Sequence, residues 1–167
     1  MTVKVHFCVL VSRDKCLTEA EIETQFDVYR EALLANDQYY GTITISSDDH
    51  PDVVIDDEVW ATVQNLCFLA APDLIAGKSV EIPYFRYGSS LKLTVEGDFV
   101  RFAGEFIPTV QVPRRELLWE LYACGLRYID FLRKLGQLDP NFMITAQNLT
   151  QQAGMAKEAI ARAGPGG

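Results

Sequence analysis

Acidic side chains crowd one stretch of this 167-residue sequence, DDHPDVVIDDEVW, which runs from residue 48 to residue 60. Six of its thirteen residues are carboxylates, and His50 is the only one of the thirteen that can become positively charged. The carboxylates are Asp48, Asp49, Asp52, Asp56, Asp57 and Glu58. Three interpretations are open: a site for a hard cation, a solvated turn that also caps a helix, and a surface that faces a basic partner.

The cation interpretation has the right ligand types but the wrong spacing. Carboxylates are preferred ligands of Ca²⁺ and Mg²⁺. However, the stretch has neither the glycine that an EF-hand loop needs at its sharp turn nor the glutamate at its twelfth position. A nuclease-type carboxylate site would also need a nearby base, and the flanking lysines along the chain are Lys15 and Lys78. We therefore expect neither a metal nor another cofactor.

Nucleophilic catalysis and phosphate binding have no signature in the chain. The sequence has no G-x-S-x-G elbow, no P-loop and no G-x-G-x-x-G. Of the two histidines, His6 lies within an apolar strand pattern and His50 lies among carboxylates. The four cysteines form no C-x-x-C pair, so we expect reduced, mostly buried thiols; they are Cys8, Cys16, Cys67 and Cys124. The chain is not expected to be an enzyme.

The net charge of −8 is concentrated in the first third of the chain. Residues 14–58 contain thirteen acids and two bases, a net charge of −11. Such a field repels nucleic acid and anionic membranes and attracts basic partners. It favours the partner-facing interpretation, with support from the acids Glu19, Glu23 and Asp27 of a preceding predicted helix. Tyr39, Tyr40 and Trp60 flank the acidic stretch and are candidate aromatic anchors.

The elements that must position these residues alternate between strand and helix patterns in the first half. Residues 3–11 and 39–47 predict strands because they alternate and are rich in β-branched residues. Residues 17–36 predict a helix that opens on the capping-box pair Thr18 and Glu21. A second helix is expected over 56–77, with Asp56 or Asp57 as its N-cap and Pro72 and Gly77 marking its end.

The second half predicts an antiparallel meander followed by a long helix. Four short strand patterns are separated by turn residues at 8–12 residue spacing and lie at 78–87, 89–97, 98–104 and 106–112. Pro113 then opens a helix that Gly136 ends, with Gly125 inside it; close approach of another element would explain this glycine. The fold class is therefore α+β: an antiparallel meander with helices packed against it, in one domain over residues 1–136. Residues 137–167 predict a C-terminal helical extension or a partly ordered tail.

The first fifteen residues lack the uninterrupted apolar run of a secretory signal, and no stretch approaches the length of a membrane span. We therefore expect a cytoplasmic protein.

The segment over residues 58–135 resembles the immunity proteins that accompany bacterial toxins of interbacterial competition systems. EVWATVQNLCF, the meander VEIPYFRYGSSLKLTVEGDFVRFAG and the helix PRRELLWELYACGLRYIDFLRKL carry this resemblance, which is one of general style and points to no single family. It implies a cytoplasmic binding protein that neutralises a cognate, basic toxin, whereas the oligomeric state is left open. The alternatives are a small-molecule-binding or enzymatic domain, with a pocket between sheet and helices that uses Tyr84, Arg86 or Arg127, and a self-assembling subunit.

Overall fold

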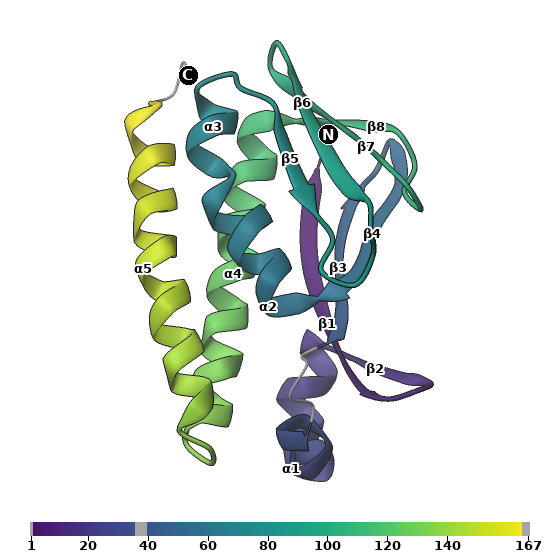
Figure 1. The fold of residues 1–167 in the computed structure, drawn as a ribbon, viewed down its shortest axis with the longest axis vertical. Helices are drawn as coiled ribbons and strands as arrows, with labels where there is room; N and C mark the ends of the chain where they lie inside the picture. Colours follow the sequence, from purple (N-terminus) through teal and green to yellow (C-terminus); the bar gives the residue numbers. More distant parts are fainter. Residues whose placement is uncertain (1, 36–39, 165–167) are drawn as a thin grey trace.

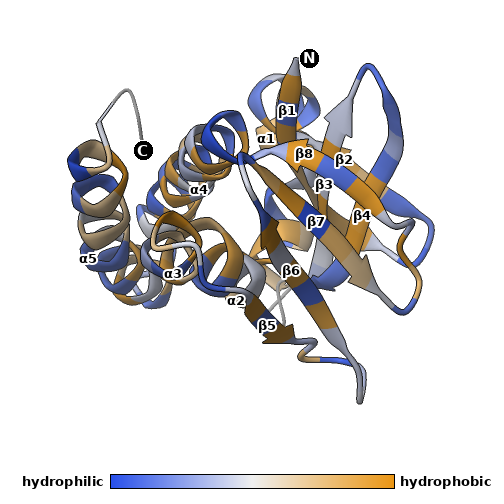
Figure 2. Cartoon of the chain, turned by 90° about the horizontal axis from the view of Figure 1, so that it is seen from above, coloured by the Kyte–Doolittle hydropathy of each residue, from blue (hydrophilic) through white to orange (hydrophobic). Residues whose placement is uncertain are grey.

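A computed structural model describes residues 2–35 and 40–164 of the chain. Two four-stranded antiparallel sheets, of order β2-β1-β3-β4 and β5-β6-β7-β8, make contact through β4 and β8. Helices cover them on one side, with α4 and the α2 segment between the sheets and α5 (Figures 1 and 2). The predicted α+β class is confirmed.

The first sheet is built from strands that alternate between core and solvent. Its strands are β1 (Val3–Ser12), β2 (Lys15–Thr18), β3 (Tyr40–Ser47) and β4 (His50–Glu58). In β1, Val5 and Phe7 are buried while Lys4 and His6 are exposed. This two-residue period places one face of the sheet against the helices and the other in water.

The acidic stretch is a strand for most of its length, rather than the solvated turn that we considered. Only Asp48 and Asp49 lie in the turn between β3 and β4. Val53, Ile55 and Asp57 then alternate inward and are buried. The carboxylates hide this strand in the sequence because aspartate is rare in strands and frequent in turns.

Helix α1 (Glu19–Ala35) begins with the predicted capping box. The backbone N–H of Glu21 donates to Oγ1 of Thr18 at 3.2 Å, and the N–H of Thr18 donates to Oε1 of Glu21 at 3.3 Å. The helix has non-helical dihedral angles at Gln25, which kink it in its second turn. Ile22 and Phe26, which are four residues apart and so share one face of the helix, are buried.

The second predicted helix is three successive helical segments, and it begins later than expected. They are α2 (Val59–Thr62), the π-helix η1 (Val63–Leu69) and α3 (Ala71–Ile75). The N-cap is Glu58, because Asp56 and Asp57 belong to β4. Gly77 follows the last segment with a φ of +78°, a conformation that glycine adopts without steric cost.

The predicted meander and the long helix after it are both present. The strands are β5 (Val80–Pro83), β6 (Ser90–Glu96), β7 (Phe99–Gly104) and β8 (Val110–Pro113). Helix α4 (Arg114–Gly136) follows directly, with Pro113 as its N-cap. The guanidinium of Arg114 donates to the carbonyl of Leu74 at the end of α3. This contact gives a role to an arginine that stands at the unfavourable end of the α4 dipole.

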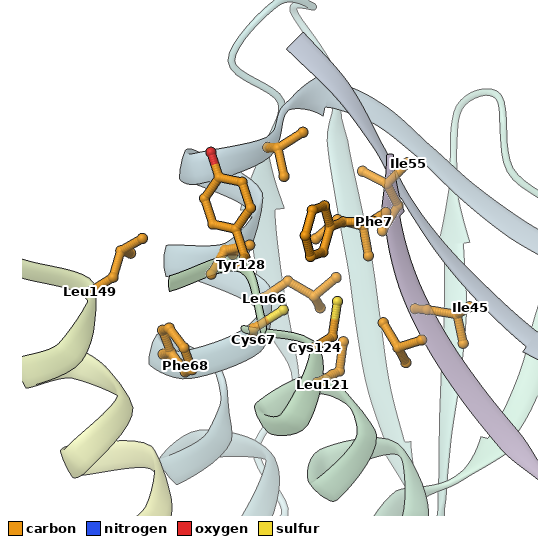
Figure 3. Packing of buried hydrophobic residues seen from close by; sticks show 14 of the residues in the cluster. Phe7, Ile45, Ile55, Leu66, Cys67, Phe68, Leu121, Cys124, Tyr128 and Leu149 are labelled. Atoms are coloured by element: carbon orange, nitrogen blue, oxygen red, sulfur yellow. The ribbon is translucent and has the colours of Figure 1, made fainter. Parts of the chain in front are cut away.

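The core joins both sheets to α4 and η1. Figure 3 labels members of it from the first sheet, η1, α4 and α5. Phe7 of β1 meets the fully buried Tyr128 of α4 edge-to-face, with ring centroids 5.3 Å apart. Gly125 lets α4 approach η1 closely: a Cβ there would lie 2.6 Å from Cε1 of Phe68 and still closer to its Cζ. The expectation that close approach explains this mid-helix glycine is confirmed.

Residues Asn141–Arg162 form helix α5, which packs against α4, η1 and α3. Its inward side is made of Phe142, Ala146, Leu149, Ala153, Ala156 and Ile160, all buried. Of the two expectations for the segment after residue 136, the helical extension therefore describes residues 141–162. The small alanines explain why the sequence pattern was weak, since they allow tight helix packing without large apolar side chains.

Gly125→Ala is expected to destabilise the fold by about 1–3 kcal/mol, because overpacking against Phe68 outweighs the helix propensity gained, about 1 kcal/mol. Urea unfolding measures this difference. The matched control is Gly154→Ala on α5, where no heavy atom lies within 4 Å of the new Cβ, and which is expected to be neutral or stabilising. Equal stabilities for the two variants would contradict the close-packing explanation.

Candidate protein-binding surface

A buried carboxylate organises the surface where β4 meets the β5–β6 loop. Asp57 is 4% exposed, and its two oxygens accept the backbone N–H groups of Phe85 at 2.6 Å and of Arg86 at 3.0 Å. The loop closes on itself because the N–H of Tyr84 donates to the carbonyl of Ser89. Charge-assisted hydrogen bonds of this kind are among the strongest in proteins, so Asp57 fixes the loop on the end of the first sheet.

Arg86 lies across the outer face of the first sheet beside this anchor. Its guanidinium is 4.4 Å from the ring centroid of Tyr40 and 5.7 Å from that of Tyr87. One of its nitrogens is 3.4 Å from Oδ1 of Asp56. Tyr40 is itself the cross-strand partner of Glu58, so β3 and β4 supply one edge of the site and the loop supplies the other.

Two further groups of aromatic rings belong to this region. Trp60 meets Phe85 edge-on at 5.6 Å, and its indole N–H donates to Glu58 at 2.9 Å. Tyr87, which lies beside Arg86, contacts both Tyr84 and Phe106. We call this set the aromatic surface. It consists of Tyr40, Trp60, Tyr84, Phe85, Arg86, Tyr87 and Phe106, with Asp56 and Glu58 at its margin.

Much of this apolar area faces solvent. Phe85 is 62% exposed and Phe106 is 76% exposed. Phe106 also has a φ of +72°, a left-handed conformation that is a steric outlier for a bulky residue. Strained backbone of this kind persists where the surrounding structure holds it, and it is concentrated at functional sites. Burial raises the pKa of Tyr84, and the nearby Asp57 carboxylate raises it further.

The predicted contact carboxylates fall into separate groups rather than one patch. Asp48 and Asp49 are exposed at the β3–β4 turn, at the end of the sheet where β1 begins, and Asp52 is exposed nearby on β4. Glu23 and Asp27 are exposed on α1, at the opposite end of the sheet (Figure 1). The nine-residue strand β4 lies between the β3–β4 turn and Asp57, which at the usual rise per residue are about 25 Å apart.

Two of the predicted contact residues serve the fold instead. Asp57 was expected on the surface, but it is buried under the loop that it anchors. Glu19 accepts a hydrogen bond from Arg127 at 2.6 Å and lies 3.4 Å from His6, so its charge is compensated within the molecule. Among the aromatic candidates, Tyr40 and Trp60 belong to the aromatic surface, and Tyr39 lies outside the described residues.

The Glu19–Arg127 pair also hydrogen-bonds to backbone groups of β1 on the edge that β2 does not cover. A carboxylate oxygen of Glu19 accepts the N–H of Phe7 at 3.2 Å, and Arg127 donates to the carbonyl of Val5 at 2.6 Å. Burial acts to lower the pKa of Arg127, but the hydrogen bond and charge of Glu19 outweigh it, so that the pKa is raised.

A groove of about 940 Å³ runs along this edge, between β1, α1 and α4. The cations on its walls are Lys4, Arg127 and Lys134, and the acids include Glu23 and Asp130. The groove therefore offers both signs of charge to an occupant.

The exposed aromatics of the β5–β6 loop were missed by sequence reasoning. The sequence pattern predicts a strand over residues 78–87 and a turn after it, and it suggests Arg86 only as a pocket residue. The available signal was composition: three aromatics and an arginine in four consecutive residues, followed by a glycine, are unusual in a solvated turn. Their link to the acidic strand could not be inferred, because Asp57 and Phe85 are 28 residues apart.

Within residues 2–35 and 40–164, no group of three or more His, Cys, Asp or Glu side chains is arranged to hold a metal ion. In the same ranges, no helix has an apolar stretch that could cross a membrane.

Comparison with protein-family models, curated proteins and solved structures found no match to this chain. The resemblance to immunity proteins therefore stays a prediction from the sequence.

Asp57→Ala is expected to destabilise the protein by about 2–3 kcal/mol, since it leaves two backbone donors without their charged acceptor. Hydrogen exchange at the amides of Phe85 and Arg86 should accelerate more than exchange in β6. Asp52→Ala, at an exposed position of the same strand, is the control and should change neither quantity. Unchanged protection of Phe85 and Arg86 in the Asp57 variant would show that the carboxylate does not hold the loop.

Proposed function

We propose that this chain is a cytoplasmic immunity-type protein that binds and neutralises a basic protein toxin, and that it acts as a binding protein rather than an enzyme. The aromatic surface supplies the anchors, and the carboxylates around it and at the β3–β4 turn supply complementary charge. The observation that carries the proposal is the exposed aromatic cluster, held rigid by Asp57.

The composition of the aromatic surface supports protein recognition. Tyrosine, tryptophan and arginine are the residues that contribute most often to binding energy at protein interfaces. A loop that is already ordered loses little conformational entropy on binding, which favours affinity. Here two backbone hydrogen bonds to Asp57 and the stacking of Arg86 on Tyr40 provide that order.

The charge distribution supports a basic partner. Five of the predicted carboxylates are exposed and make no ion pair with another residue in the described ranges; they are Asp48, Asp49, Asp52, Glu23 and Asp27. Although they are spread over the molecule, they contribute to a net charge of −8, which accelerates encounter with a cation at low salt. Fast encounter suits a protein that must intercept a toxin arriving from outside.

The test is co-expression with the toxin encoded by the reading frame beside this gene, scored by cell survival. The double variant Phe85→Ala/Tyr87→Ala is expected to abolish protection and to weaken the purified complex by at least about 2 kcal/mol, roughly 30-fold. The control is Phe99→Ala, which removes a ring 40% exposed at the start of β7, across the second sheet from the loop. Protection by the double variant equal to that by wild type would reject the aromatic surface as the binding site.

Association kinetics test the electrostatic part separately. Asp48→Asn/Asp49→Asn/Asp52→Asn is expected to slow association several-fold at low salt while changing the dissociation rate little, because exposed charges mainly affect encounter. The difference should shrink as ionic strength rises toward 0.5 M. Faster association of the neutralised variant would mean that the partner is acidic.

The groove between β1, α1 and α4 favours a second candidate function, the binding of a small ligand. Its volume lies in the range of ligand sites, and its lining includes the cation of Lys134 and the carboxylate of Asp130. A zwitterionic metabolite would match this mixture of charges. Such a ligand should raise the unfolding temperature of wild type and of Phe85→Ala/Tyr87→Ala alike, and Lys134→Ala should reduce the shift. Absence of any shift across a library of charged metabolites would exclude this candidate.

A further inference from the structure

The hairpin of β1 and β2 brings two cysteines together that are separated in the sequence. Cys8 lies opposite Thr18 and Cys16 lies opposite Leu10, so the two cysteines are diagonal neighbours on the same face of the hairpin. Both residues are half-buried. Sequence reasoning found no cysteine pair because the seven intervening residues hide the hairpin register.

The nearness of Cys16 favours a thiolate at Cys8. The neighbouring Cys16 thiol lowers the pKa of Cys8 to about 6, and Thr42 adds to this shift, whereas burial and the carboxylates of Glu19 and Glu21 oppose it. The nearness of Cys8, together with burial, raises the pKa of Cys16, which therefore stays a thiol. A thiolate beside a second thiol is the arrangement of a redox-sensitive cysteine with a resolving partner.

We propose that Cys8 and Cys16 form a peroxide-sensitive dithiol that closes to a disulfide between β1 and β2. The site takes hydroperoxides as its substrate class, with Cys8 as the attacking residue and Cys16 as the resolving one. This inference is independent of the proposed binding function.

The reaction balances in two steps. In the first, the Cys8 thiolate attacks the peroxide, an S–O bond forms as the O–O bond breaks, and the leaving alkoxide or hydroxide takes a proton from water. Cys8 is now a sulfenic acid, and the peroxide has been reduced to an alcohol or water. In the second, Cys16 sulfur attacks the sulfenic sulfur, the S–O bond breaks, and the Cys16 proton leaves with the hydroxide as water. A small dithiol restores both thiols.

The place of the pair in the fold allows this closure. Diagonal neighbours lie farther apart than a disulfide requires, so the strands must shift slightly toward one another. Strand β2 has only four residues, it is the outer strand of its sheet, and its register with β1 already shifts between Leu10 and Ser12. The exposed turn at Arg13 and Asp14 joins the strands, so it can absorb the adjustment.

A second cysteine pair in the core provides an internal contrast. Cys67 of η1 and Cys124 of α4 are fully buried and lie next to one another (Figure 3). Burial raises the pKa of Cys67 well above its ordinary value, so neither peroxide nor a thiolate is available there. Proximity alone is therefore not expected to make this pair reactive.

The experiment treats the reduced, full-length protein with hydrogen peroxide and maps its tryptic peptides without reduction. Trypsin cleaves after Arg13 and Lys15, which separates Cys8 from Cys16 unless a disulfide joins their peptides. We expect a Cys8–Cys16 linked peptide, reversible by dithiothreitol, while the Cys67 and Cys124 peptides stay reduced. We also expect Cys8 to be alkylated at least tenfold faster than Cys16 at pH 7, with a midpoint near pH 6.

Conservative variants assign the two roles. Cys16→Ser should accumulate Cys8 sulfenic acid that dimedone captures, whereas Cys8→Ser should leave Cys16 largely unmodified. Circular dichroism establishes that each variant is folded. The proposal is overturned if peroxide leaves both thiols of the folded protein free, if the disulfides that form are intermolecular, or if Cys8 and Cys16 react no faster than in the urea-unfolded chain.

Discussion

The arrangement of the candidate surface depends on one buried carboxylate. Asp57 is the last inward-facing residue of β4, and the two N–H groups that it accepts come from a loop of the other sheet. A buried charge is costly unless it is fully hydrogen-bonded, so the loop and the strand stabilise one another. The two hydrogen bonds hold the backbone from which the exposed rings of Phe85 and Tyr87 project. The exposure of these aromatic rings thus follows from the way Asp57 holds the β5–β6 loop.

A second constraint, the close contact at Gly125, determines how the helices pack against the sheets. The absence of a side chain at Gly125 allows α4 to approach η1, and the same helix places Tyr128 against Phe7 of β1. Arg127, one residue before Tyr128, consequently reaches the edge of β1 and its partner Glu19. The close contact of α4 with η1 therefore positions both Tyr128 in the core and the Arg127–Glu19 pair beside the groove.

Sequence patterns predicted those features that local chemistry determines. The capping box of Thr18 and Glu21, the meander, the start of α4 after Pro113 and the role of Gly125 could all be inferred from spacing and residue type. The misassigned acidic strand shows the limit. Asp57 looks like an N-cap or a surface charge in sequence, and only the distant loop that it binds turns it into a buried anchor. Likewise Glu19 looked like a contact residue because Arg127 lies 108 positions away. Residues distant in the sequence determine whether these carboxylates are buried or paired, and local patterns do not encode those partners.

The side chains of Glu19 and Arg127 occupy the place that another strand would take beside Val5 and Phe7. An unprotected strand margin is a template for pairing with other chains, and proteins commonly block it with charge. This ion pair therefore places charged side chains on part of the β1 edge. It occupies the N–H of Phe7 and the carbonyl of Val5, two backbone groups with which a neighbouring copy could otherwise pair.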